Sequence, residues 1–124
     1  MKNLVIIMAL FGSMFGSKAQ NSDALTVLNS KEYKEAIEEK DVQLVDVRTA
    51  AEFDEGAIND AINIDYFKQD VFDQKFNKLD KDQPVYLYCR SGNRSQKATA
   101  KLEALGFTKI FDLKGGYQKW PYKN

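Results

Sequence analysis

The chain has 124 residues, of which 44% are hydrophobic and 29% charged, and its formal net charge is zero. This length suits one compact domain, and this balance is typical of a globular protein rather than a disordered one. A net charge of zero provides no excess of basic residues, so nucleic acid is not expected as a partner. The sequence has no histidine and one cysteine, which excludes imidazole catalysis, an internal disulfide and the usual zinc sites.

The first 19 residues are predicted to be a secretory signal peptide. Lys2 gives a positive start, residues 4–15 are almost wholly apolar, and Ser17 and Ala19 are the small residues that a signal peptidase reads. The alternative, an uncleaved anchor, needs about 20 apolar residues, more than this run provides. We therefore expect cleavage between Ala19 and Gln20, a mature domain over residues 20–124, no stable membrane insertion after cleavage, and export to the periplasm or beyond the cell.

Apolar runs alternate with helical patterns from Ala24 onward, which favours βαβ units and a mostly parallel sheet. Strands are predicted over residues 24–28, 42–47, 61–64, 85–88 and 108–113. Helix-capping signals occur at Asn29, followed by Glu32, and at Thr49, followed by Glu52. Further helices are predicted over residues 71–79, 95–105 and 117–120, with a tight turn over residues 91–94 and Gly106 as the residue that ends the second of these helices.

The segment most informative about function surrounds Cys89. The strand over residues 85–88 runs directly into this cysteine, a short loop containing Gly92 follows, and a helix begins at once. Backbone N–H groups of such a loop, the positive end of the helix dipole, and the charges of Arg90 and Arg94 all favour a thiolate over a thiol. Taken singly, the arginines can be solvated surface charges, Gly92 an ordinary turn residue, and Cys89 a buried inert thiol. Their joint placement favours an anion-binding thiolate loop.

Three motifs give the sequence a resemblance to the single-domain rhodanese family. The first motif is Leu44-Val-Asp46-Val-Arg48 followed by Glu52-Phe53, Gly56, Ile58 and residues 61–64. The second is the loop from Cys89 to Ser95. The third runs from Leu105-Gly106-Phe107 through Leu113, Gly115-Gly116-Tyr117 and Trp120.

The resemblance implies an α/β fold, a five-stranded parallel sheet flanked by helices on both faces. It implies a sulfurtransferase in which Cys89 takes sulfur from a donor such as thiosulfate, becomes a persulfide, and passes the sulfur to cyanide or a thiol. No metal or cofactor is implied; the expected partners are a small anionic donor and a thiol or protein acceptor, and the expected state is a monomer. The loop residues implied to bind substrate are Arg90, Ser91, Gly92, Asn93, Arg94 and Ser95, and those implied to form a structural charge cluster near the site are Asp46, Arg48 and Glu52.

The sequence departs from the family pattern at Ala57, where histidine is usual, and at Asp60, where glycine is usual. Three other functions remain open: a dedicated persulfide carrier, a non-catalytic module that binds an anion or a partner, and a cysteine-dependent phosphatase. The phosphatase is disfavoured because its loop has five residues between cysteine and arginine, whereas four separate Cys89 from Arg94. A tetrahedral phosphate needs that wider loop, and one terminal sulfur fits the tighter one.

Overall fold

The computed structural model describes residues 23–39 and 41–123, so the predicted signal peptide and its cleavage site lie outside the described residues. No helix in the described part of the chain has the length and apolar character needed to cross a membrane. The elements in chain order are β1 (Leu25–Leu28), α2 (Ser30–Glu39), β2 (Gln43–Asp46), α3 (Ala50–Glu55), β3 (Ile62–Asn63), α4 (Gln69–Phe76), β4 (Val85–Tyr88), α5 (Asn93–Leu105), β5 (Ile110–Leu113) and the 3-10 helix η1 (Tyr117–Lys119).

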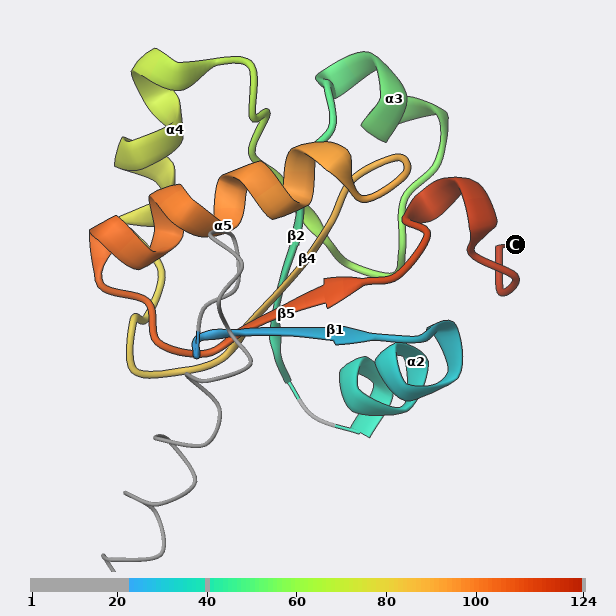
Figure 1. The fold of residues 1–124 in the computed structure, drawn as a ribbon. Helices are drawn as coiled ribbons and strands as arrows, with labels where there is room; N and C mark the ends of the chain where they lie inside the picture. The colour runs from blue at the N-terminus through green and yellow to red at the C-terminus, as the bar shows by residue number, and fades with distance from the viewer. Residues whose placement is uncertain (1–22, 40, 124) are drawn as a thin grey trace, which may run out of the picture.

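A five-stranded sheet in the order β1-β5-β4-β2-β3 forms the centre of the domain, and every pair of neighbouring strands is parallel (Figure 1). Alternate residues of β4 face opposite cores, since Leu87 packs with α4 and α5 residues while Tyr88 packs with α2 residues. The predicted α/β fold with a parallel sheet and helices on both faces is therefore confirmed. Strand β4, which delivers Cys89, lies in the middle of the sheet.

The predicted helix caps are present as reciprocal hydrogen bonds. The Asn29 side chain accepts from Glu32 N–H while the Glu32 carboxylate accepts from Asn29 N–H, and Thr49 and Glu52 repeat this arrangement before α3. Several boundaries differ from prediction, and every strand except β4 is shorter than predicted. The turn over residues 91–94 was wrong in its second half because α5 already begins at Asn93, and α4 lies two to three residues earlier than the predicted 71–79.

An ion pair joins α3 to α5. The Arg94 guanidinium places Nη1 2.8 Å from Oε1 of Glu52 and Nη2 3.1 Å from Oε2, a two-point contact that is largely shielded from solvent. Hydrogen bonding from Arg94 is the main cause that lowers the pKa of Glu52 from 4.5 to about 2, with Thr49 contributing through the helix cap. The carboxylate of Glu52 thus caps its own helix and also forms an ion pair with α5.

Gly116 lets the chain after β5 pack closely against the loop after β4. Its φ is +65°, and a Cβ added there would lie 2.4 Å from the carbonyl oxygen of Arg90. The next two residues hold this contact, because Tyr117 N–H donates to the Cys89 carbonyl and Gln118 N–H donates to the Arg90 carbonyl. The backbone of the Cys89 loop is therefore fixed from outside by the C-terminal segment.

Replacing Glu52 with Gln is expected to lower the free energy of unfolding by about 1 kcal/mol at neutral pH, after discounting for the partial exposure of the pair. The amide oxygen keeps the helix cap. The folded-state pKa of Glu52 is below its ordinary value. The difference in the free energy of unfolding between the two proteins should therefore be largest above about pH 5, and it should vanish as the pH falls towards 2. Denaturant titrations of both proteins across this range measure the difference. The exposed Glu55 of the same helix provides the control, Glu55→Gln; an equal loss there would contradict the assignment.

Replacing Gly116 with Ala is expected to destabilise the domain more than replacing Gly115 with Ala. Both glycines have positive φ, so each substitution costs about 1 kcal/mol in backbone conformation. A Cβ at Gly115 comes no closer than 3.2 Å to the Lys119 side chain, whereas a Cβ at Gly116 overlaps backbone and adds about 2 kcal/mol or more. Chemical denaturation measures the free energy of unfolding of both variants. Equal losses in this free energy would show that the close backbone approach at Gly116 does not contribute to stability.

Candidate functional site

The site lies at the carboxyl ends of the neighbouring strands β2 and β4. The chain leaves β2 through α3 towards β3 at one edge of the sheet, and it leaves β4 through α5 towards β5 on the other side. The segments after these two strands therefore diverge. In open α/β sheets, a crevice at such a divergence is where ligands bind.

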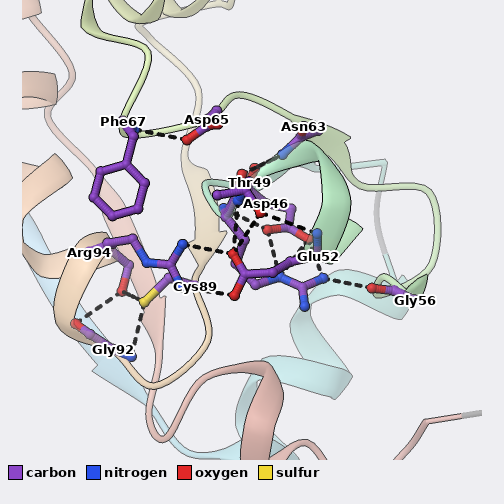
Figure 2. Close-up of polar contacts among 12 residues, drawn as sticks. Asp46, Thr49, Glu52, Gly56, Asn63, Asp65, Phe67, Cys89, Gly92 and Arg94 are labelled. Atoms are coloured by element: carbon purple, nitrogen blue, oxygen red, sulfur yellow. Dashed lines mark hydrogen bonds and ion pairs between the residues drawn. The ribbon is translucent and has the colours of Figure 1, made fainter. Parts of the chain in front are cut away.

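The sulfur of Cys89 lies inside the loop that starts α5. Gly92 N–H donates to Sγ at 3.0 Å (Figure 2). The thiol donates to Oγ of Ser95 at 3.5 Å. The residue is 1% exposed, so the sulfur is enclosed by the loop rather than presented on the surface. The sequence predicted that several loop amides converge on the sulfur; among the described residues, the hydrogen bond from Gly92 is the one backbone contact to Sγ.

The six predicted loop residues differ in how they face the sulfur. Gly92 adopts a left-handed conformation with φ of +106°, which brings its N–H back towards Sγ. Ser95 is buried beside the sulfur and also donates from Oγ to the Gly92 carbonyl at 3.2 Å. Three other residues of the loop are exposed to solvent: Arg90, Ser91 and Asn93.

Arg94 does not point freely at the crevice. Its guanidinium is held by Glu52 and lies over the ring of Phe67, 5.3 Å from the ring centre (Figure 2). The negative charge of Glu52 offsets much of the positive charge that the sequence assigned to the loop. The free cation near Cys89 in the described residues is Arg90, which lines the adjoining cavity without an ion pair.

Asp46 and Arg48 form a second, fully buried ion pair beneath the crevice. Arg48 Nη2 lies 2.6 Å from Asp46 Oδ2, and it donates to the Gly56 carbonyl at the same distance. The Arg48 guanidinium also lies 4.3 Å from the ring centre of Tyr117. Of the three residues predicted as one charge cluster, Asp46 pairs with Arg48 and Glu52 pairs with Arg94, and, against the lowering effect of burial, the charge of Glu52 still raises the pKa of Arg48.

A cavity of about 460 Å³ opens beside the loop. Its rim carries both signs of charge, and the residues that line it are Arg48, Glu52, Glu55, Arg90, Tyr117, Gln118 and Lys123. Within residues 23–39 and 41–123, no group of three or more acidic, histidine or cysteine side chains is placed to hold a metal ion.

Sequence reasoning missed Asp112, a buried residue of β5 beside α5. It is 1% exposed, and neither carboxylate oxygen has a hydrogen-bond partner. Burial raises the pKa of Asp112 from 3.8 to about 6, although the side chains of Ser95 and Gln96 and the Leu113 N–H oppose the rise from nearby. The available signal was one carboxylate within the otherwise apolar strand Ile110–Leu113.

Comparisons with known proteins agree with this architecture. The family model described as a rhodanese-like domain matches residues 29–122. The chain is 35% identical over 89 residues to a "Thiosulfate sulfurtransferase GlpE" of Pseudomonas savastanoi pv. phaseolicola, covering 72% of this chain and 81% of that protein. It is 33% identical over 89 residues to a "tRNA uridine(34) hydroxylase" of Pelagibacter ubique, again 72% of this chain but 30% of that longer protein.

A solved structure gives the same result. The crystal structure of a rhodanese-like domain protein from Staphylococcus aureus matches with a TM-score of 0.69 and 31% sequence identity, covering 80% of this chain and 96% of that one. The family match spans every strand of the sheet except β1, which lies before it, and it includes the whole Cys89 loop. The chain belongs to the rhodanese-like domain family.

Proposed function

We propose that the protein is a sulfurtransferase in which Cys89 carries one sulfur atom as a persulfide. The observation that carries the proposal is the Gly92 N–H directed at Sγ of Cys89, at the start of α5 and at the carboxyl edge of the sheet. The first N–H groups of a helix lack intrahelical partners and form a site suited to an anion. A thiolate, and then the terminal sulfur of a persulfide, is an anion of the size such a loop can enclose.

The first half-reaction loads the sulfur. The Cys89 thiolate attacks the outer sulfur of an anionic donor such as thiosulfate, a new S–S bond forms, and the S–S bond of thiosulfate breaks. The electron pair of that bond leaves with sulfite. Once the thiol proton has left to solvent, the attack itself moves no proton, so a site without histidine can perform this step. The helix dipole and Arg90 oppose the repulsion between two anions.

The second half-reaction unloads the sulfur. A nucleophile such as cyanide or a thiolate attacks the outer sulfur of the persulfide and forms a bond to it. The Cys89 S–S bond breaks, and its electron pair returns to Sγ as the thiolate. The Gly92 N–H that contacts Sγ in the resting protein is placed to stabilise this leaving group.

The cavity beside the loop is the proposed approach for donor and acceptor. Arg90 and Lys123 on its rim attract an anion, while Glu52 and Glu55 oppose a second one. This mixed rim suits small anions that arrive and leave one at a time. The family member named as a thiosulfate sulfurtransferase supports thiosulfate as a donor class to test first.

A phosphatase is less well supported than sulfur transfer. A cysteine-dependent phosphatase needs its arginine inside the loop to bind phosphate oxygens, but Arg94 is bound at two points by Glu52. A dedicated persulfide carrier fits the same site and differs only in its acceptor. We also propose that the protein acts after export, because the signal-peptide pattern precedes the domain.

Mature protein incubated with thiosulfate is expected to gain the mass of one sulfur atom, measured on the intact chain. Cyanide should remove the added mass and release thiocyanate. Cys89→Ser should fold normally, shown by an unchanged circular dichroism spectrum, and gain no mass. If neither thiosulfate nor a low-molecular-weight persulfide loads Cys89, the non-catalytic binding module replaces this proposal.

Arg94→Gln is expected to lower kcat/KM for thiosulfate about tenfold more than for an uncharged sulfur donor, since Glu52 is then left as an uncompensated negative charge near the crevice. The double variant Glu52→Gln and Arg94→Gln removes both charges and should restore most of the selectivity for the anionic donor. Steady-state kinetics with the two donors measures this. Equal losses for both donors would show that Arg94 only holds α5 against α3.

A further inference from the structure

The charges that line the cavity beside the Cys89 loop are sorted by element. The acidic residues Glu52 and Glu55 both come from α3. The exposed basic residues come from elsewhere, Arg90 from the loop after β4 and Lys123 from the segment after η1. Helix α3 and the C-terminal segment lie near one another at the end of the sheet where this loop is found (Figure 1). The cavity thus has an acidic side and a basic side.

Ion pairs within the protein neutralise only part of this charge. Arg48 is bound by Asp46, and Glu52 is bound at two points by Arg94. Three exposed charged residues of the lining have no ion pair among the described residues: Glu55, Arg90 and Lys123. One carboxylate and two cations therefore remain available to a ligand.

An anionic sulfur donor does not account for Glu55. Its carboxylate repels a small dianion such as thiosulfate. Glu55 is also the last residue of α3, where a negative charge is disfavoured by the helix dipole. The cavity volume of about 460 Å³ falls within the range of about 300–1,000 Å³ that is typical of pockets for small organic molecules, and it exceeds what thiosulfate or cyanide requires. These features favour a second, larger substrate that carries a positive charge as well.

We propose that the sulfur acceptor is a small zwitterionic thiol, with its carboxylate bound by Arg90 and its ammonium group bound by Glu55. This inference rests on the proposed function, because it needs a persulfide on Cys89. Arg90 directly follows Cys89 in the chain, so a carboxylate bound there holds the attached thiol close to the loop. Glu55 is then a specificity-determining residue.

The transfer step follows the second half-reaction described above. The acceptor thiol loses its proton to solvent, and its sulfur forms a bond to the outer sulfur of the persulfide. The bond between that outer sulfur and Sγ of Cys89 breaks, and its electron pair returns to Sγ. The acceptor leaves as its own persulfide, with both of its charged groups unchanged.

The basic side of the cavity is held in a fixed position relative to Cys89. Lys123 Nζ donates to the Gln118 carbonyl at 3.2 Å and lies 4.7 Å from the ring centre of Tyr117. The N–H groups of Tyr117 and Gln118 in turn donate to the carbonyls of Cys89 and Arg90. Lys123 is thereby placed as a second cation for the acceptor carboxylate.

The test starts from protein that has been loaded with sulfur, so that it measures the unloading step alone. Four small thiols separate the two charges. Cysteine carries both, 3-mercaptopropionate carries only the carboxylate, cysteamine carries only the ammonium group, and 2-mercaptoethanol carries neither. The second-order unloading rate of each variant is divided by that of the unaltered protein with the same thiol. The intrinsic reactivity of the thiol cancels in this ratio.

Arg90→Gln is expected to slow unloading by cysteine and 3-mercaptopropionate by about threefold to fivefold relative to 2-mercaptoethanol, the size expected for an ion pair at an exposed site. Glu55→Gln should slow cysteine and cysteamine by a similar factor. Two exposed charges that do not line the cavity provide the controls, Lys78→Gln and Glu103→Gln, and these should change no ratio. An equal loss for all four thiols in Arg90→Gln, or an unchanged rate with cysteine in Glu55→Gln, overturns the proposal.

A binding measurement separates this inference from the proposed function. S-methylcysteine carries both charges but no thiol, so its binding needs no persulfide. In the unaltered protein it should shift the backbone amide NMR signals of Arg90 and Glu55, and no shift at millimolar concentrations overturns the inference. Protein that cannot be loaded with sulfur contradicts the proposed function instead. Loaded protein that transfers to cyanide but shows no dependence on the charges of the thiol retains the proposed function and rejects the zwitterionic acceptor.

Discussion

The chemistry that we propose depends on one contact, the hydrogen bond from Gly92 N–H to the sulfur of Cys89. The contact exists because β4 delivers the cysteine to the middle of the sheet edge and α5 begins four residues later. Gly92 turns the chain back with a positive φ, and Gly116 lets the C-terminal segment bind the carbonyls of Cys89 and Arg90. The loop is thereby held from both sides before any substrate arrives.

The charges near the sulfur are mostly paired. Arg48 is bound by Asp46 below the crevice, and Arg94 is bound by Glu52 at its edge. The attraction for an anion that we propose therefore comes mainly from the Gly92 N–H and the helix dipole, with Arg90 and Lys123 as exposed cations on the cavity rim. Such a field is fixed by the fold, so the sulfur transfer that we propose needs no rearrangement of side chains when charge moves between donor, sulfur and acceptor.

Local patterns predicted the elements well and the site only in part. Caps at Asn29 and Thr49 and the limits of β4 depend on residues close in sequence, and these predictions were confirmed. The Glu52–Arg94 pair joins residues 42 apart, and Tyr33 of α2 donates to the carbonyl of Leu87, 54 residues later. No local pattern encodes such contacts, because they arise only when the crossovers bring separate strands and helices together.

We propose that the loop encloses a sulfur anion with its amides. A crystal structure of the protein after loading with thiosulfate tests it most directly. We expect the outer sulfur of the Cys89 persulfide to lie within the loop, at hydrogen-bonding distance from N–H groups of residues 91–95. An outer sulfur directed into solvent or into the apolar core, with the loop amides unchanged, would contradict the account.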